Sequence, residues 1–270
     1  MNTLKIRETT LQAGRPKIAV PLVSADPKEI IEECEKVRQM PCQIIEWRAD
    51  KYIGAIDDLQ RAMEEKEFYL DLIKILDDIN YIADGMPVIF TLRTKAQGGD
   101  LELSREHTAQ IQTLVAQSEL ADFVDVELFD SEGKADEAFL RGLIDETHSY
   151  GCRVILSHHD FEKMPEPVEI VKIVSTMANL GADVYKTAAM ALSAEDAEKL
   201  LKATAFLNKN KVGPIITVAM GEYGKAARVA AGRYGSCITF ASGLKESAPG
   251  QVDVHTMQKW LDDYYGKEEE

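Results

Sequence analysis

The sequence predicts a single (β/α)8 barrel that spans all 270 residues. Short apolar segments alternate with segments of helical periodicity along the whole chain, and there are eight of each. The apolar segments lack regular polar alternation, which is typical of parallel strands covered on both faces. We find no linker rich in Pro, Gly or Ser and no internal repeat, so we expect one domain over 1–270. An open doubly wound sheet is the alternative, but no GxGxxG motif follows the first strand.

Each expected strand is a short and mainly apolar run bounded by glycine, proline or polar residues. In chain order the strands are expected at residues 18–22, 44–48, 88–92, 123–127, 153–157, 183–185, 214–219 and 237–240. Ahead of them, residues 4–11 and 15–17 flank Gln12-Ala-Gly14. This arrangement predicts an N-terminal hairpin with its turn at Gln12-Ala-Gly14.

Capping residues mark several helix boundaries. Ser24 or Asp26 precedes Pro27, and proline is favoured at the first position of a helix. Ser193 opens the sequence Ser-Ala-Glu-Asp, which resembles a capping box. The other helices are expected at about 57–81, 104–117, 134–150, 167–180, 223–234 and 254–264, and residues 268–270 as a frayed acidic tail.

Composition and charge exclude several function classes. A net charge of −15 argues against nucleic acids and anionic membranes as partners. No apolar run approaches the roughly 20 residues of a membrane helix, and the N-terminus has no apolar signal region. The four cysteines form no CxxC pair. We therefore expect reduced thiols in a cytoplasmic protein, without a zinc site or a cofactor.

The segment from Gly181 to Met190 contains the most unusual residue, Lys186, at the expected end of the short strand 183–185. Lysine is rarely buried without a partner. Burial or nearby cations would lower its pKa and leave some neutral amine, which can form a Schiff base with a ketone. The alternative is a lysine whose ammonium simply reaches solvent from the strand end.

The carboxyl ends of the other expected strands carry a matching set of polar residues. In a barrel of this kind these ends form the active site. The candidates are Glu46, Arg48, Arg93, His158, His159, Lys186, Arg228, Ser247 and Gln251. Taken singly, these residues have structural explanations. Glu46 and Arg48 could form an ion pair, His158 or His159 could be a core histidine, and the segment that begins at Ser247 could be a turn. Together they predict a pocket for an anionic, hydroxylated substrate, with a lysine nucleophile and a histidine acid/base.

At these positions the chain resembles the type I 3-dehydroquinate dehydratases. The motifs are Glu46-Trp-Arg48, Phe90-Thr-Leu-Arg93, Asp125-Val-Glu-Leu128, His159-Asp-Phe161, Gly181-Ala-Asp183 with Lys186, and Ser247-Ala-Pro-Gly-Gln251. The resemblance implies a barrel closed at its bottom by an N-terminal hairpin, a homodimer, and no metal. It also implies the dehydration of 3-dehydroquinate to 3-dehydroshikimate, a step of the shikimate pathway of aromatic amino acid biosynthesis or of quinate metabolism.

The resemblance also implies roles for individual residues. Lys186 would form the imine, and His159, rather than His158, would move the proton in a syn elimination. Arg228, assisted by Gln251, would bind the carboxylate. Ring hydroxyls would be bound by Glu46, Arg48, Arg93 and Ser247, and the apolar walls would be Phe161, Ala188, Met220 and Phe240.

The sequence departs from the family pattern most clearly at Gln97, where the family has a glutamate that supports the catalytic histidine. Glutamine keeps a hydrogen bond but carries no charge, so we expect slower proton transfer. The alternative is that Asp100 or Glu127 supplies the charge. Two smaller departures are Val218-Ala-Met-Gly221 and Ala227, which precedes Arg228.

Two other functions stay open at this point. One is a different lysine-dependent barrel lyase, of the aldolase kind, acting on a related polyhydroxy carboxylate. The other is a relative that binds the ligand without catalysis, although the presence of both Lys186 and His159 argues against it.

Overall fold

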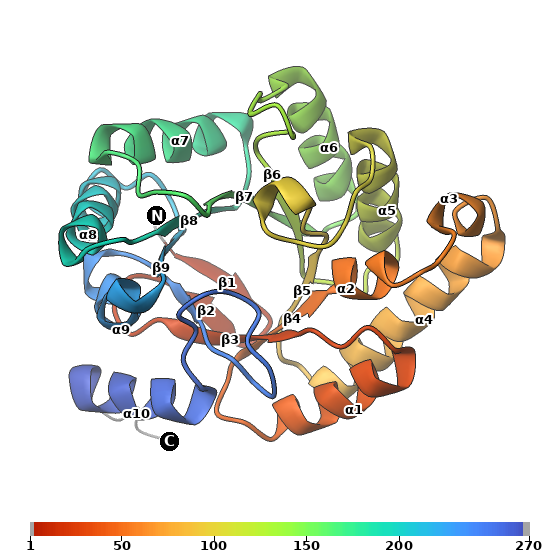
Figure 1. Cartoon of the computed structure of the whole chain (residues 1–270), viewed down its shortest axis with the longest axis horizontal. Helices are drawn as coiled ribbons and strands as arrows, with labels where there is room; N and C mark the ends of the chain where they lie inside the picture. Colours follow the sequence, from red (N-terminus) through yellow and green to blue (C-terminus); the bar gives the residue numbers. More distant parts are fainter. Residues whose placement is uncertain (1–2, 267–270) are drawn as a thin grey trace.

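A computed structural model describes residues 3–266 and contains a parallel barrel surrounded by helices (Figure 1). The acidic tail expected at 268–270 lies outside these residues. Within them, eight strands pair in parallel in the order β10-β3-β4-β5-β6-β7-β8-β9. They are β3 (Lys17–Leu22), β4 (Ile44–Arg48), β5 (Val88–Thr91), β6 (Phe123–Glu127), β7 (Arg153–Asp160), β8 (Val184–Met190), β9 (Ile215–Met220) and β10 (Ile238–Phe240). A bridge between Ile215 and Ser236 brings the two ends of this sheet together, so the predicted barrel is confirmed.

The helices form an outer ring around the strands (Figure 1). They are α1 (Pro27–Arg38), α2 (Ala49–Gly54), α3 (Leu59–Ala62), α4 (Lys66–Ala83), α5 (Arg105–Gln117), α6 (Glu137–Ser149), α7 (Pro167–Leu180), α8 (Ala194–Lys209), α9 (Lys225–Tyr234) and α10 (Val254–Tyr265), with short 3-10 turns η1 (Lys95–Gln97) and η2 (Glu222–Gly224). Asp26 and Ser193 cap α1 and α8 through side-chain hydrogen bonds, as the sequence predicts. Within residues 3–266, no helix has the length and apolar character needed to cross a membrane.

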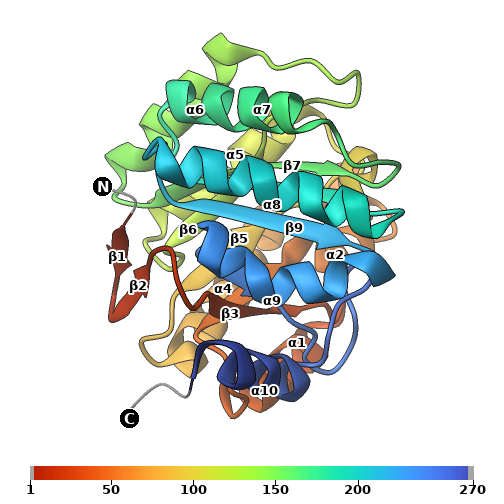
Figure 2. The same ribbon diagram turned by 90° about the vertical axis from the view of Figure 1, so that its left-hand side faces the viewer.

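An N-terminal hairpin of β1 (Leu4–Ile6) and β2 (Thr9–Leu11) closes one end of the barrel. Figure 2 shows it at the end opposite to the one toward which β9 points. Its apolar residues Ile6 and Leu11 join the cluster of inward-facing strand residues, among them Ile89 and Phe123. The hairpin therefore fills the bottom of the barrel, and the carboxyl ends of the strands stay open for a site.

The position of the hairpin turn was predicted incorrectly. Residues 4–6 pair with 9–11, so the turn lies at Arg7 and Glu8 rather than at Gln12-Ala-Gly14. Arg7 has a positive φ of 50°, which a non-glycine residue rarely adopts. Its guanidinium donates to Asp122 Oδ1 (2.8 Å) and Asn80 Oδ1 (2.7 Å), so distant residues hold the turn in place.

Element boundaries also differ from the expected ones. The strand expected at 153–157 extends to Asp160. The helix expected at 57–81 is divided into α3 and α4, and Tyr69 Oη donates to the Met63 carbonyl that the break leaves free. The sixth barrel strand is longer than 183–185, because β8 continues through Lys186 to Met190. Its residues from Lys186 to Met190 pair with β9, from Ile216 to Met220, and this pairing outweighs the low strand preference of Ala188 and Ala189.

Candidate active site

The side chains selected from the sequence gather around one cavity of about 60 Å³ at the carboxyl ends of the strands. Its lining includes Glu46, Arg48, Arg93, Gln97, His159, Lys186, Met220, Arg228, Phe240, Ser247 and Gln251. Phe161 and Ala188, expected as apolar walls, also line it. The strands bring these residues together because all eight run parallel and end at the same face.

Lys186 lies within β8 and points into the barrel, where only 5% of its surface is exposed. Its Nζ lies 3.2 Å from Asp125 Oδ2 and 3.6 Å from Glu46 Oε1. The ammonium also lies 4.4 Å from the centre of the Phe240 ring. The lysine is therefore held inside the cavity by two carboxylates and an aromatic ring, and does not reach solvent from a strand end.

Asp125 on β6 links Lys186 to Arg93, a role that we did not assign from the sequence. Its Oδ1 accepts from Arg93 Nη2 (2.8 Å) and from Ser157 Oγ (2.6 Å). Burial alone would raise the pKa of Asp125, but Arg93 and Lys186 outweigh it and lower the pKa. The signal available in the sequence was an acidic residue inside an apolar strand, within a motif already singled out.

The two arginines near the strand ends are paired with carboxylates. Arg48 makes a bidentate pair with Asp50, with Nε and Nη2 each 2.7 Å from a carboxylate oxygen. Arg93 contacts Asp125 and also donates from Nη1 to Glu127 Oε1 (2.9 Å). Burial would lower the pKa of both arginines, but these acids raise it. Carboxylates within the protein thus largely compensate the charge of both arginines. Their remaining N–H groups can still donate hydrogen bonds to hydroxyl groups.

Gln97 contacts His159 from one side and the protein backbone from the other. Its Nε2 donates to the Phe129 carbonyl (3.0 Å), which turns Oε1 toward the histidine. Oε1 accepts from the His159 backbone N–H (2.9 Å) and lies 3.2 Å from His159 Nδ1. An amide oxygen can only accept, so Nδ1 carries the proton and Nε2 keeps its lone pair. Gln97 therefore holds the neutral tautomer that can act as a base at Nε2.

The surroundings of His159 disfavour its charged form. Burial is the largest cause, followed by Arg93 and Lys186, and together they lower the pKa of His159 well below 6.5. The two carboxylates considered as substitutes for the family glutamate have other partners. Asp100 pairs with Lys51 (2.6 Å), and Glu127 binds Arg93 and Thr94.

His158 occupies a different environment from His159. Its ring packs edge-on against Phe129, with centroids 4.9 Å apart, and it does not line the cavity. Burial lowers the pKa of His158 as well. The structure thus separates the two neighbouring histidines, since successive residues of a strand point to opposite faces.

Among the three arginines that line the cavity, Arg228 on α9 is the one without a carboxylate in direct contact. Only 2% of its surface is exposed, and its hydrogen bonds go to the carbonyls of Phe240 (3.4 Å) and Pro249 (3.2 Å). Within residues 3–266 it forms no ion pair, its Nε has no hydrogen-bond partner, and the nearby Glu246 offsets its charge only in part. Burial lowers its pKa to about 10. This guanidinium can bind a carboxylate without breaking an existing ion pair.

The loop after β10 borders the cavity next to Arg228. Gln251 Oε1 accepts from the backbone N–H (2.7 Å) and Oγ (3.1 Å) of Ser247. Gly221, in the segment that departs from the family pattern, donates its N–H to the Pro249 carbonyl (3.1 Å). The two loops are therefore connected through backbone contacts.

In the described part of the chain, no group of three or more His, Cys, Asp or Glu side chains could hold a metal ion.

Comparisons with known proteins agree with one another. The family model of the type I 3-dehydroquinases matches residues 18–268. The chain is 38% identical to a 3-dehydroquinate dehydratase of Clostridium kluyveri over 96% of both chains, and 36% identical to one of Listeria welshimeri over 97% of this chain and 98% of that one.

Solved structures show the same similarity. The type I 3-dehydroquinate dehydratase of Clostridium difficile, crystallised with covalently modified comenic acid, has a TM-score of 0.86 at 29% identity and covers 97% of each chain. The 3-dehydroquinate dehydratase of Geobacillus kaustophilus also has a TM-score of 0.86, at 27% identity over 98% of each chain.

Proposed function

Because this chain belongs to the type I 3-dehydroquinase family and is a 3-dehydroquinate dehydratase, a hydro-lyase, we propose that it removes water through a Schiff base on Lys186. The observation that carries this proposal is a buried lysine at the centre of a cavity that also holds a neutral histidine and an arginine without an ion pair. The product would be 3-dehydroshikimate.

In the first step, Lys186 Nζ attacks the ketone carbon of the substrate, and the carbonyl oxygen leaves as water. The result is a protonated imine between Nζ and that carbon. The ammonium must lose a proton before this attack. Glu46, with Oε1 3.6 Å away, is placed to take this proton, because the other nearby carboxylate, Asp125, already accepts hydrogen bonds from Arg93 and Ser157. The imine withdraws electrons from the neighbouring carbon and makes its proton more acidic.

In the second step, His159 Nε2 removes that proton, and the electron pair moves toward the imine nitrogen. The same imidazolium then protonates the departing hydroxyl, which leaves as water, and a final hydrolysis frees Lys186. His159 accepts the proton and delivers it to the departing hydroxyl from the same face of the ring, which corresponds to a syn elimination. The neutral tautomer held by Gln97 supports this role, because the Nε2 lone pair is free.

The proposed substrate contacts follow from the different ion pairing of the arginines, since Arg48 and Arg93 contact carboxylates and Arg228 does not. Arg228 would bind the carboxylate, with Gln251 beside it. Ring hydroxyls would meet Glu46, Arg48, Arg93 and Ser247, whose contacts within the protein fix their positions in advance. Met220 and Phe240 would border the apolar side of the ring.

Gln97 would make proton transfer slower than a glutamate would. His159 has Arg93 and Lys186 as charged neighbours, and both oppose the imidazolium that forms when it accepts a proton. A carboxylate at position 97 would offset this effect, whereas the amide contributes only orientation. We expect the Schiff base to form normally and the later steps to limit turnover.

A spectrophotometric assay for the conjugated enone product tests the proposed reaction. Formation of this product from 3-dehydroquinate, lost in Lys186→Ala, supports it. A lysine adduct without the enone would instead favour an aldolase-like lyase. The absence of both the adduct and the enone would favour a ligand-binding protein.

We also propose a cytoplasmic homodimer. Light scattering of the purified chain tests the dimer, and cell fractionation tests the location.

A further inference from the structure

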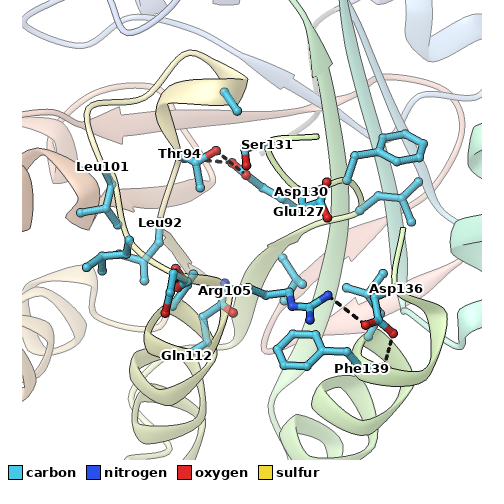
Figure 3. A pocket seen from close by; sticks show the side chains of 18 of the residues that line it. Leu92, Thr94, Leu101, Arg105, Gln112, Glu127, Asp130, Ser131, Asp136 and Phe139 are labelled. Carbon is cyan, nitrogen blue, oxygen red and sulfur yellow. Dashed lines mark hydrogen bonds and ion pairs between the residues drawn. The ribbon is translucent and has the colours of Figure 1, made fainter. Parts of the chain in front are cut away.

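A second and larger cavity lies outside the barrel, between α5 and α6 (Figure 3). Its volume is about 330 Å³, which lies within the range of small-molecule sites in proteins. Its inner wall is apolar and buried, and consists of Leu92, Leu101, Val126, Leu128, Leu140 and Leu143. Phe129 and Phe139 add two aromatic rings. The interior therefore suits a compact aromatic or aliphatic body.

The mouth of this cavity is polar, and its cations already have partners. The pairs are Lys95–Glu102 (2.7 Å), Arg105–Asp136 (3.0 Å) and Lys134–Glu132 (2.7 Å). Figure 3 shows Arg105 directed toward Asp136. Arg105 also lies over the Phe139 ring, 4.2 Å from its centre. An anionic ligand would have to compete with carboxylates for each of these cations.

Asp130 at the same mouth is differently placed. Its Oδ1 accepts the backbone N–H groups of Glu132 and Lys134, at 2.9 Å each. In the described part of the chain no ion pair joins it to a cationic side chain, but the Lys134 backbone hydrogen bond and the nearby charges of Lys134 and Arg105 all lower the pKa of Asp130. The net charge of −15 also attracts cations to the surface and repels anions. A ligand with an ammonium group would thus meet an ionised carboxylate that is outside any ion pair, beside an apolar interior, and would share it with the nearby Lys134 and Arg105 charges.

The wall of this cavity is shared with the catalytic site. The Phe129 carbonyl holds the Gln97 amide, which contacts His159. Glu127 also lines the cavity and binds Arg93 Nη1 (2.9 Å) and Thr94 Oγ1 (2.7 Å). A molecule packed against Phe129 and Glu127 would change the positions of groups that orient the catalytic histidine and arginine.

We propose that the α5–α6 cavity is a second binding site, which takes a small primary amine with a single-ring apolar body and alters turnover from outside the barrel. The ammonium would bind Asp130 and the ring would occupy the apolar interior beside Phe129 and Phe139. Only the effect on turnover rests on the proposed roles of Gln97 and His159, because binding depends on the cavity alone.

Calorimetry with 2-phenylethylamine tests the binding half. We expect saturable binding to the wild-type chain, and binding at least tenfold weaker for the neutral isostere 2-phenylethanol. In Asp130→Asn the new amide oxygen can still accept hydrogen bonds from the loop N–H groups, but the negative charge is lost. The variant should therefore also weaken amine binding at least tenfold. Equal affinity for amine and alcohol, equal affinity of the two proteins, or no saturable binding would overturn the proposal.

A second variant covers the possibility that Asp130→Asn disturbs its loop. Leu103 is half-buried and lines the cavity, so Leu103→Trp should fill the space and abolish amine binding while the chain stays folded. In turnover assays with the wild-type chain, saturating amine should change kcat at least twofold with little change in KM. Competition with substrate would place the amine in the barrel, and an unchanged kcat would remove the coupling; each result counts against the proposal.

Discussion

The two ends of the barrel use their charged side chains in different ways. At the bottom, cationic side chains have acidic partners within the protein: Arg7 binds Asp122 (2.8 Å), and Arg153 binds Asp183 (2.9 Å), which also contacts the His148 ring (2.7 Å). At the top, Arg228 is almost fully buried and forms no ion pair within residues 3–266. A buried charge is costly unless it is compensated. The bottom contacts therefore stabilise the fold, whereas Arg228 carries the charge that we propose binds the substrate carboxylate.

Lys186 should produce the largest effect at the top of the barrel. Without its amine no imine can form, so Lys186→Ala should lower kcat by a factor on the order of 10⁴ or more, as for the loss of a covalent nucleophile. Thermal unfolding of the variant should change by a few degrees at most. Steady-state kinetics with 3-dehydroquinate measures the loss, and turnover close to that of the wild type would contradict the covalent role.

Arg228 should separate binding from stability. Arg228→Ala should weaken substrate binding about 10²-fold or more, because a buried guanidinium paired with a ligand carboxylate is lost. Its melting temperature should stay constant or rise, since a buried charge without an ion pair is removed. Arg228→Lys serves as the matched control and should retain part of the affinity. A large loss of stability with an unchanged KM would identify Arg228 as a structural residue.

Gln97 should have a smaller effect that appears in kcat. Gln97→Glu should raise kcat about tenfold to 10²-fold with a smaller change in KM, because a carboxylate would stabilise the imidazolium of His159. The same charge would raise the pKa of His159, which burial, Arg93 and Lys186 now hold well below 6.5. The acid limb of kcat/KM, which requires neutral His159, should therefore move to higher pH in the variant.

Loss of the hydrogen bond to the Phe129 carbonyl partly opposes this gain, since a carboxylate cannot donate to it. Gln97→Ala is the control without either group, and should lower kcat by freeing the His159 ring. An unchanged or lower kcat in Gln97→Glu, without a displaced acid limb, would mean that the missing charge does not limit this enzyme.

Asp183 should show the opposite behaviour at the bottom of the barrel. Asp183→Asn removes the charge that Arg153 and His148 contact, although the amide oxygen can still accept from the Val154 N–H. We expect a loss of about 1–2 kcal/mol in unfolding free energy, measurable as a few degrees in thermal melting. The values of kcat and KM should stay within about twofold. A selective loss of activity would remove the distinction between the two ends.

Much of the fold was predictable because its signals are local. Short apolar runs, Pro27 and the caps at Asp26 and Ser193 identify elements within a few residues. The turn at Arg7 was not predictable, because contacts with Asn80 and Asp122 hold a positive φ that the local sequence does not favour. The full length of β8 was also missed, since pairing with β9 decides it.

The candidate site shows the same division. Side chains at strand ends could be selected because parallel strands place them at one face. The links between them join residues far apart in the sequence, such as Asp125 with Arg93 and Lys186, or Phe129 with Gln97. No local pattern specifies such contacts. Local patterns also did not separate Arg228 from the paired Arg48 and Arg93; only the resemblance to the family assigned them different roles.

The central claim is that Lys186 becomes covalently bonded to the substrate. Reduction with borohydride in the presence of 3-dehydroquinate, followed by peptide mass analysis, tests it most directly. We predict a ligand-derived adduct on the peptide that contains Lys186, present in Gln97→Glu and absent from Lys186→Ala and from samples without substrate. An adduct on another lysine, or continued turnover with no adduct at all, would contradict the account.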